Sequence, residues 1–64
     1  MSQPCPTIQE AGDYFRTVHI RHVQDYVVTD VFCGTVRCVE VLLDNLEVWR
    51  FDRGHGGGYW HQVG

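Results

Sequence analysis

Strand-forming residues dominate the chain from Tyr14 onward, and short turn-forming segments interrupt them. Valine, isoleucine, threonine, tyrosine and phenylalanine fit a pleated surface, whereas Gly34 and Asp44-Asn45 favour turns. No segment between the expected strands is long enough for a crossover helix, so the strands should pair antiparallel. We therefore predict an all-β fold, a small antiparallel meander of about five strands.

Two expected hairpins give this meander its first four strands. In the first, Tyr14 to Val23 would pair with Tyr26 to Cys33 across Gln24-Asp25. In the second, Thr35 to Leu43 would pair with Leu46 to Asp52 across Asp44-Asn45. A two-residue connection there would match Leu43 with Leu46 and Val41 with Val48.

The fifth strand would run from about Tyr59 to Val63 and return antiparallel to Trp49 and Phe51. Curling of the five strands into an open barrel would hide most of the sheet edges. The expected architecture resembles an SH3-like barrel in outline, and this likeness implies no function.

A helix over about residues 36–50 is the alternative, and it would give a ββαβ fold. Four charged residues recur there at helical spacing and would form one polar stripe: Arg37, Glu40, Asp44 and Glu47. The β-branched residues and the Asp-Asn pair oppose a helix. We therefore favour the hairpin.

Sixty-four residues make one domain at most. Residues 1–12 are expected to form a loose leader, since Pro4 and Pro6 favour extended backbone, and residues 13–64 to form a single β-domain. Thr7 followed by Glu10 is a weak capping-box pattern, which allows a short helical turn near Ile8 to Ala11.

So short a chain buries only about 60% of the surface that its unfolded form exposes. Chains of this size usually gain further stability from a disulfide, a metal or a partner subunit. Homodimerisation is compatible with this.

Charge and cysteine content restrict the partner and the compartment. Five arginines, no lysine and eight carboxylates give a formal net charge of -3, which works against binding a phosphate backbone. We expect no secretory signal and no membrane span, because the amino end lacks a charged region followed by an apolar one and no apolar run is long enough. Three cysteines, Cys5, Cys33 and Cys38, are too few for a disulfide framework, so reduced thiols in the cytoplasm are expected.

No residue set indicates an enzyme. His55-Gly56-Gly57-Gly58 matches a glycine-rich motif that supplies oxyanion-hole amides in some esterases, but the only serine is Ser2. Cys33, His19 and Asp30 could serve as the nucleophile, base and orienting carboxylate of a cysteine enzyme. The expected register, however, places Cys33 on the opposite face of the sheet from the other two.

A structural zinc site is an alternative that would also stabilise so small a core. Its four ligands would be Cys33, Cys38, His55 and His61. Both the cysteine and the histidine spacings are wider than those of zinc fingers, so we expect no cofactor.

The segment from Trp49 to His61 places aromatic rings and arginines around a glycine-rich loop, a composition typical of interface hot spots. We expect the domain to bind another protein as an inhibitor or accessory protein of phage or mobile-element type. The expected contact residues are Trp49, Arg50, Arg53, His55, Tyr59 and Trp60. A single-stranded nucleic-acid-binding barrel is the other alternative, since such barrels also use aromatics with nearby arginine.

Overall fold

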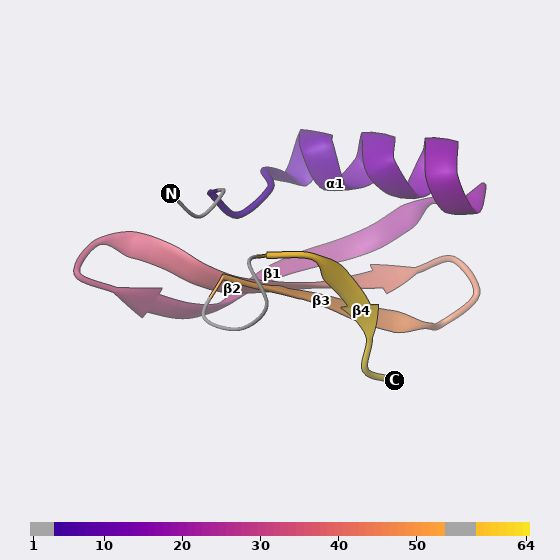
Figure 1. Cartoon of the computed structure of the whole chain (residues 1–64). Helices are drawn as coiled ribbons and strands as arrows, with labels where there is room; N and C mark the ends of the chain where they lie inside the picture. Colours follow the sequence, from indigo (N-terminus) through magenta and orange to yellow (C-terminus); the bar gives the residue numbers. More distant parts are fainter. Residues whose placement is uncertain (1–3, 54–57) are drawn as a thin grey trace.

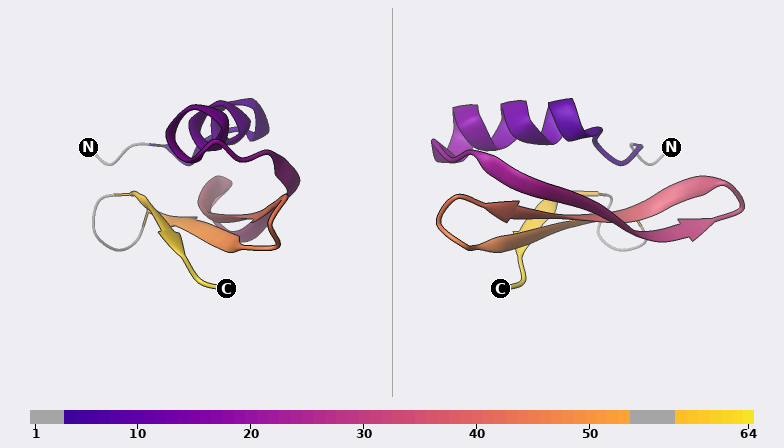
Figure 2. Two further views of the ribbon diagram at one scale, coloured as in Figure 1. Left: turned by 90° about the vertical axis from the view of Figure 1, so that its right-hand side faces the viewer. Right: turned by 180° about the vertical axis from the view of Figure 1, so that it is seen from behind.

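The computed structural model describes residues 4–53 and 58–64. The elements in chain order are α1 (Ile8–Tyr14), a π-helical turn η1 (Phe15–His19), β1 (Val23–Phe32), β2 (Thr35–Leu43), β3 (Val48–Asp52) and β4 (Trp60–Gln62). The strands form one antiparallel sheet in the order β1-β2-β3-β4, and the helical segment lies over one face of it (Figure 1, Figure 2). The expected all-β meander is therefore confirmed, with four strands in an open sheet instead of about five.

The helical segment begins at a complete capping box. The Glu10 backbone N–H donates to the Thr7 hydroxyl at 3.2 Å, and the Thr7 N–H donates to Glu10 Oε1 at 3.0 Å. The expected turn near Ile8 is confirmed, but the helix continues well past it because Ala11 and Phe15, one turn apart, both become fully buried against the sheet. The prediction of a strand from Tyr14 to Val23, and with it the first hairpin, is wrong.

A left-handed residue ends the helical segment. Ile20 has φ 56° and ψ 47°, and its N–H and that of Arg21 both donate to the Phe15 carbonyl. Glycine is the usual residue in this conformation, because a Cβ then crowds the following carbonyl oxygen. Ile20 is β-branched and 77% exposed, so the chain accepts backbone strain here without burying the side chain.

β1 runs directly through Gln24-Asp25, which the sequence had favoured as a turn. The turn that follows it is Cys33-Gly34, where both residues have positive φ, 52° and 75°. Phe32 pairs with Thr35 across it, so this is a tight two-residue hairpin. The break predicted at Gly34 is confirmed as a turn.

The second hairpin is confirmed, and the alternative helix over residues 36–50 is wrong. The register of the hairpin differs from the expected register by one residue, because the connection between the two strands contains a third residue, Leu46, with φ 70°. Leu43 therefore bonds Glu47 instead of facing Leu46, and Val41 pairs with Trp49 instead of Val48. Since side chains alternate between faces, this shift decides which residues face the helix.

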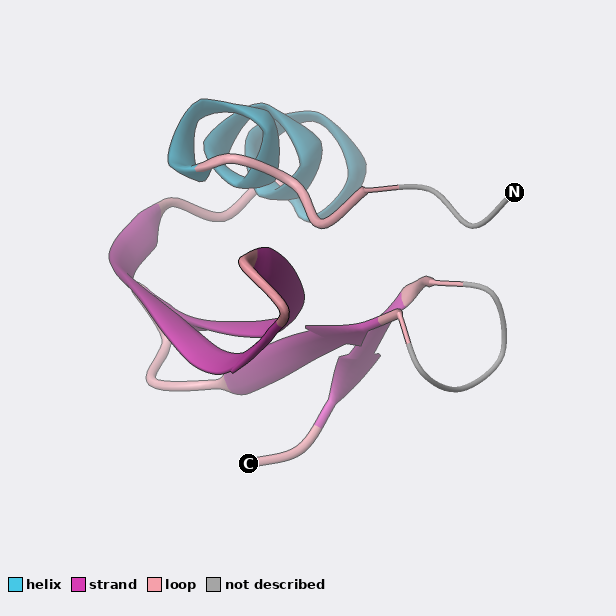
Figure 3. Cartoon of the chain, turned by 90° about the vertical axis from the view of Figure 1, so that its left-hand side faces the viewer, coloured by secondary structure: helices cyan, strands magenta, loops and turns pink. Residues whose placement is uncertain are grey.

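The core lies between the helical segment and the sheet. Its fully or nearly buried side chains come from α1, η1, β2 and β3: Ala11, Phe15, Val39, Val41, Leu43 and Phe51. No described element covers the opposite face (Figure 3). A polar row, Glu40, Arg50 and His61, crosses that face in register, and Arg50 donates to Glu40 Oε2 from Nε at 2.9 Å and from Nη2 at 2.7 Å.

Candidate functional site

Both tryptophans singled out in the sequence lie half-buried beneath the helical segment. The Trp49 ring is 5.5 Å from Phe15 and 4.8 Å from His19, measured between ring centroids. The Trp60 ring is 5.0 Å from Phe15. The corrected register explains this placement, because Trp49 pairs with the buried Val41 and Trp60 pairs with Phe51, and these residues lie on the helix face of the sheet. The main role of these two rings is therefore to build the core.

Tyr59 is the ring that points outward. It is 56% exposed, whereas the adjacent Trp60 is half-buried. It borders an open cleft of about 350 Å³ between α1 and the β3–β4 end of the sheet. We call this the aromatic cleft, and its lining residues are Pro6, Glu10, Tyr14, Phe51, Gly58, Tyr59 and Trp60.

Gly58 shapes one wall of the aromatic cleft. Its φ is 84°, and a Cβ built on it would lie 3.0 Å from two carbons of the Phe51 ring. Only glycine satisfies both the left-handed backbone and this approach. The glycine-rich run thus has a packing function at its last residue, whereas Gly56 and Gly57 lie outside the described residues.

The opposite wall comes from the residues before α1, which are anchored to β1. The Tyr26 hydroxyl donates to the Pro6 carbonyl oxygen at 2.5 Å. Burial raises the pKa of the Tyr26 phenol, and the thiol of Cys5 and the carboxylate of Glu10 raise it further. Burial likewise raises the pKa of the Cys5 thiol, partly offset by the cation of Arg53. The phenol therefore stays protonated and able to donate this bond at neutral pH.

Among the described lining residues of the aromatic cleft, Glu10 carries the one formal charge. The arginines predicted to contact a partner lie elsewhere. Arg50 is on the uncovered face of the sheet, paired with Glu40. Arg53 lines a separate recess of about 220 Å³ with Phe32, Cys33, Thr35 and Arg37. His55 lies outside the described residues. Of the five predicted contact residues that the structure describes, Tyr59 and Trp60 line this cleft.

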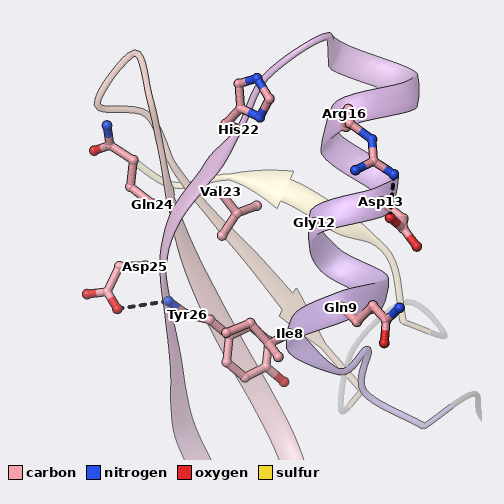
Figure 4. Close-up of a pocket in the computed structure, with 10 residues that line it drawn as sticks. All are labelled: Ile8, Gln9, Gly12, Asp13, Arg16, His22, Val23, Gln24, Asp25 and Tyr26. Carbon is pink, nitrogen blue, oxygen red and sulfur yellow. Dashed lines mark hydrogen bonds and ion pairs between the residues drawn. The ribbon is translucent and has the colours of Figure 1, made fainter.

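A second groove, of about 390 Å³, separates the helical segment from β1 (Figure 4). Its lining is largely polar and includes the ion pair of Arg16 with Asp13, at 2.6 Å. Gly12 leaves the groove open, since a Cβ on it would meet nothing within 4 Å. Asp25 accepts the backbone N–H of Tyr26 at 2.9 Å and so occupies a donor that an added strand would need.

Both edges of the sheet carry features that oppose pairing with another strand. The β1–β2 ladder has three register shifts, between Val23 and Asp25, Val28 and Asp30, and Asp30 and Val31. Bulges of this kind twist an edge away from a straight partner. The other edge, β4, is only three residues long. Strand pairing is therefore a poor route to a homodimer.

Of the four predicted zinc ligands, His55 lies outside the described residues, and the other three do not form a cluster. Cys33 is exposed in the β1–β2 turn, Cys38 is buried in β2, and His61 lies in β4. Within residues 4–53 and 58–64, no three His, Cys, Asp or Glu side chains are arranged to hold a metal ion.

The three residues considered as a cysteine catalytic set, Cys33, His19 and Asp30, also lie apart from one another. His19 packs on the rings of Phe15 and Trp49, while Cys33 and Asp30 belong to the β1–β2 hairpin, which extends toward the other end of the molecule (Figure 1). Neither a nucleophile with its base nor a base with its orienting carboxylate is assembled from these residues.

Neither helical segment in the described part of the chain has the length and apolar character that crossing a bilayer requires. The chain matches no protein-family model, no curated protein and no solved structure.

Sequence reasoning missed the residues before and within α1 that complete the aromatic cleft: Pro6, Glu10 and Tyr14. A signal for them was present. Apolar residues at Ile8, Ala11, Phe15 and Val18 follow helical spacing, and the capping box stands directly in front of them.

Proposed function

We propose that the protein is a small non-catalytic interaction domain that docks on another protein through the aromatic cleft. The observation that carries the proposal is the cleft itself, in which Tyr14, Phe51, Tyr59 and Trp60 supply four of the seven lining residues. Aromatic side chains dominate binding hot spots because they bury a large area at a small cost in side-chain entropy. Tyr59 at the rim is the exposed member of this set.

A partner other than a second copy fits the molecule best. The net charge of -3 is unfavourable for a nucleic-acid backbone, and the register shifts of β1 and the shortness of β4 disfavour joining two sheets edge to edge. An inhibitor or accessory protein of phage or mobile-element type, acting in the cytoplasm, remains our proposal for its biological setting. Its three free cysteines accord with a reducing compartment.

Capture of the partner with matched variants tests this function. Tagged wild type would be incubated with lysate of the source cells, and bound proteins identified and quantified by mass spectrometry. Tyr59→Ala removes an exposed ring at the cleft, whereas Phe32→Ala removes an equally exposed ring, at 62%, from the β1–β2 hairpin. Near-ultraviolet circular dichroism would establish that both variants keep the packed core.

We expect a specific protein whose capture falls at least about tenfold with Tyr59→Ala, as for a hot-spot residue, and is unchanged with Phe32→Ala. Trp60→Ala is a poor choice, because Trp60 packs on Phe15 and its loss would disturb the core. A partner lost with Phe32→Ala but retained by Tyr59→Ala would place the docking surface on the hairpin and refute the proposal.

A further inference from the structure

We infer that the aromatic cleft receives an arginine side chain of the partner, with the guanidinium stacked on the rings and hydrogen-bonded to Glu10. This inference rests on the proposed docking function and specifies its chemistry. A guanidinium is planar, weakly hydrated and permanently charged, so it gains from an aromatic face and from a carboxylate at the same time.

The rings of the cleft form a rigid surface for such a side chain. Tyr14 and Trp60 lie nearly parallel, with 22° between their planes and 6.3 Å between their centroids. Phe51 supports Trp60 edge-on at 5.5 Å. Because these three rings hold one another, Trp60 loses little side-chain entropy on binding. The exposed ring of Tyr59 lies beside His61, with 5.7 Å between the ring centroids.

The capping box fixes the carboxylate of Glu10 at the rim. Its Oε1 accepts the Thr7 N–H at 3.0 Å, which orients the side chain at the start of α1. An ionised carboxylate offers about four lone-pair sites, so this single bond leaves capacity to accept N–H donors from a guanidinium. Capping and ligand recognition would therefore share one side chain.

Charge complementarity favours a cationic occupant over a neutral or acidic one. Among the described lining residues Glu10 is the only charged one, and the faces of the four rings carry partial negative charge. The arginines of the carboxyl-terminal half that line a pocket, Arg37 and Arg53, lie in the separate recess beside Phe32. A carboxylate entering the cleft would meet Glu10 without an opposing cation from the lining.

Titration with one small cation and its neutral isostere tests the inference. The probes are N-acetyl-arginine methylamide and N-acetyl-citrulline methylamide, which share a shape and differ in charge. Shifts of the Tyr59 amide and the Trp60 indole in ¹H–¹⁵N spectra of the full chain would report binding. We expect the arginine probe to bind about tenfold more tightly than the citrulline probe.

Two matched variants separate the charge from the fold. Glu10→Gln preserves the capping box, since glutamine also serves at that position, but removes the carboxylate. We expect it to weaken the arginine probe about fivefold or more and to leave the citrulline probe unchanged. Asp13→Asn removes the same charge from the same helix beside the other groove, and should leave both probes unchanged.

Equal binding of the two probes, no binding of either, or equal effects of Glu10→Gln and Asp13→Asn would each overturn the inference. None of these outcomes would touch the docking function, which fails only if capture of the partner does not depend on Tyr59. Shifts centred on Arg37 and Arg53 instead of the cleft would likewise overturn the inference.

Discussion

Replacing Ile20 with glycine should stabilise the protein, although it deletes a large apolar side chain. Ile20 ends the helical segment in the left-handed region, with φ 56° and ψ 47°. Its side chain is 77% exposed, so the native state gains little from burying it. The backbone conformation is retained because the Phe15 carbonyl accepts the N–H groups of both Ile20 and Arg21.

The size of the effect follows from two opposing terms. Relief of the left-handed conformation is worth about 1–2 kcal/mol for a residue with a Cβ. Glycine loses about 0.5–1 kcal/mol through the greater freedom of the unfolded chain. The net gain lies between about 0 and 1.5 kcal/mol in the free energy of unfolding. Its midpoint, about 0.75 kcal/mol, raises Tm by roughly 3–6 °C in a domain of this size.

Thermal and urea unfolding of Ile20→Gly, Ile20→Ala and wild type would measure the gain. Ile20→Ala is the informative control, because it removes the same exposed side chain but keeps the Cβ that causes the crowding. We expect alanine to lie well below glycine in stability. If the two variants had the same stability, or if glycine were the less stable, backbone strain at Ile20 would not be the reason.

Three further perturbations test other parts of the structure. The free energy of unfolding, measured against pH, should fall as pH rises above about 9, because the folded-state pKa values of Cys5 and Tyr26 are raised above the ordinary 9.0 and 10.0 and the stability they contribute is complete only below those values. Tyr26→Phe should make this fall shallower and should cost about 0.5–1.5 kcal/mol at pH 7. An equally steep fall in Tyr26→Phe would contradict this prediction. Gly58→Ala should lower Tm by several degrees, because alanine is strained at a φ of 84° and its Cβ would lie 3.0 Å from the Phe51 ring. A Tm equal to that of wild type would show that the packing of Phe51 on Gly58 leaves room for a methyl group. Phe15→Ala should cost about 3–5 kcal/mol and abolish the near-ultraviolet dichroism, whereas a cooperative transition at wild-type temperature would mean that Phe15 is not the centre of the core.

Strand propensity and turn chemistry predicted the second half of the fold well and the first half poorly. Residues 35–52 are rich in strand-forming residues on both sides of Asp44-Asn45, and the hairpin formed there. Its register was wrong because Leu46 occupies a left-handed position that leucine rarely adopts, so no sequence rule marks it as part of the turn.

The error over Tyr14 to Val23 has a different cause. Thr17, Val18 and Ile20 favour a strand by local propensity, but burial of Ala11 and Phe15 against the sheet outweighs that preference. Tertiary packing therefore provides the free energy that stabilises the helical segment. The sequence feature that indicates this helix is the helical spacing of the apolar residues after the capping box.

Two of the four aromatic residues that line the cleft were among the predicted contact residues, and Tyr14 and Phe51 were not. Tyr59 and Trp60 were expected at a contact surface, and both line the cleft. Glu10 and Tyr14 come from the opposite end of the chain, and only the fold brings them to the same place. A surface built from both termini cannot be recognised in either segment alone.

The dependence of Phe15 on late residues also has a consequence for biosynthesis. The capped helix leaves the ribosome before the sheet, but Trp49 and Trp60, the ring partners of Phe15, lie in β3 and β4. The β1–β2 hairpin can form as soon as its own residues emerge, whereas the apolar side of the helix stays exposed until β3 and β4 have emerged. Chains that stop before β4 should therefore be held by chaperones or degraded, and the folding rate should be limited by this long-range closure and not by helix formation.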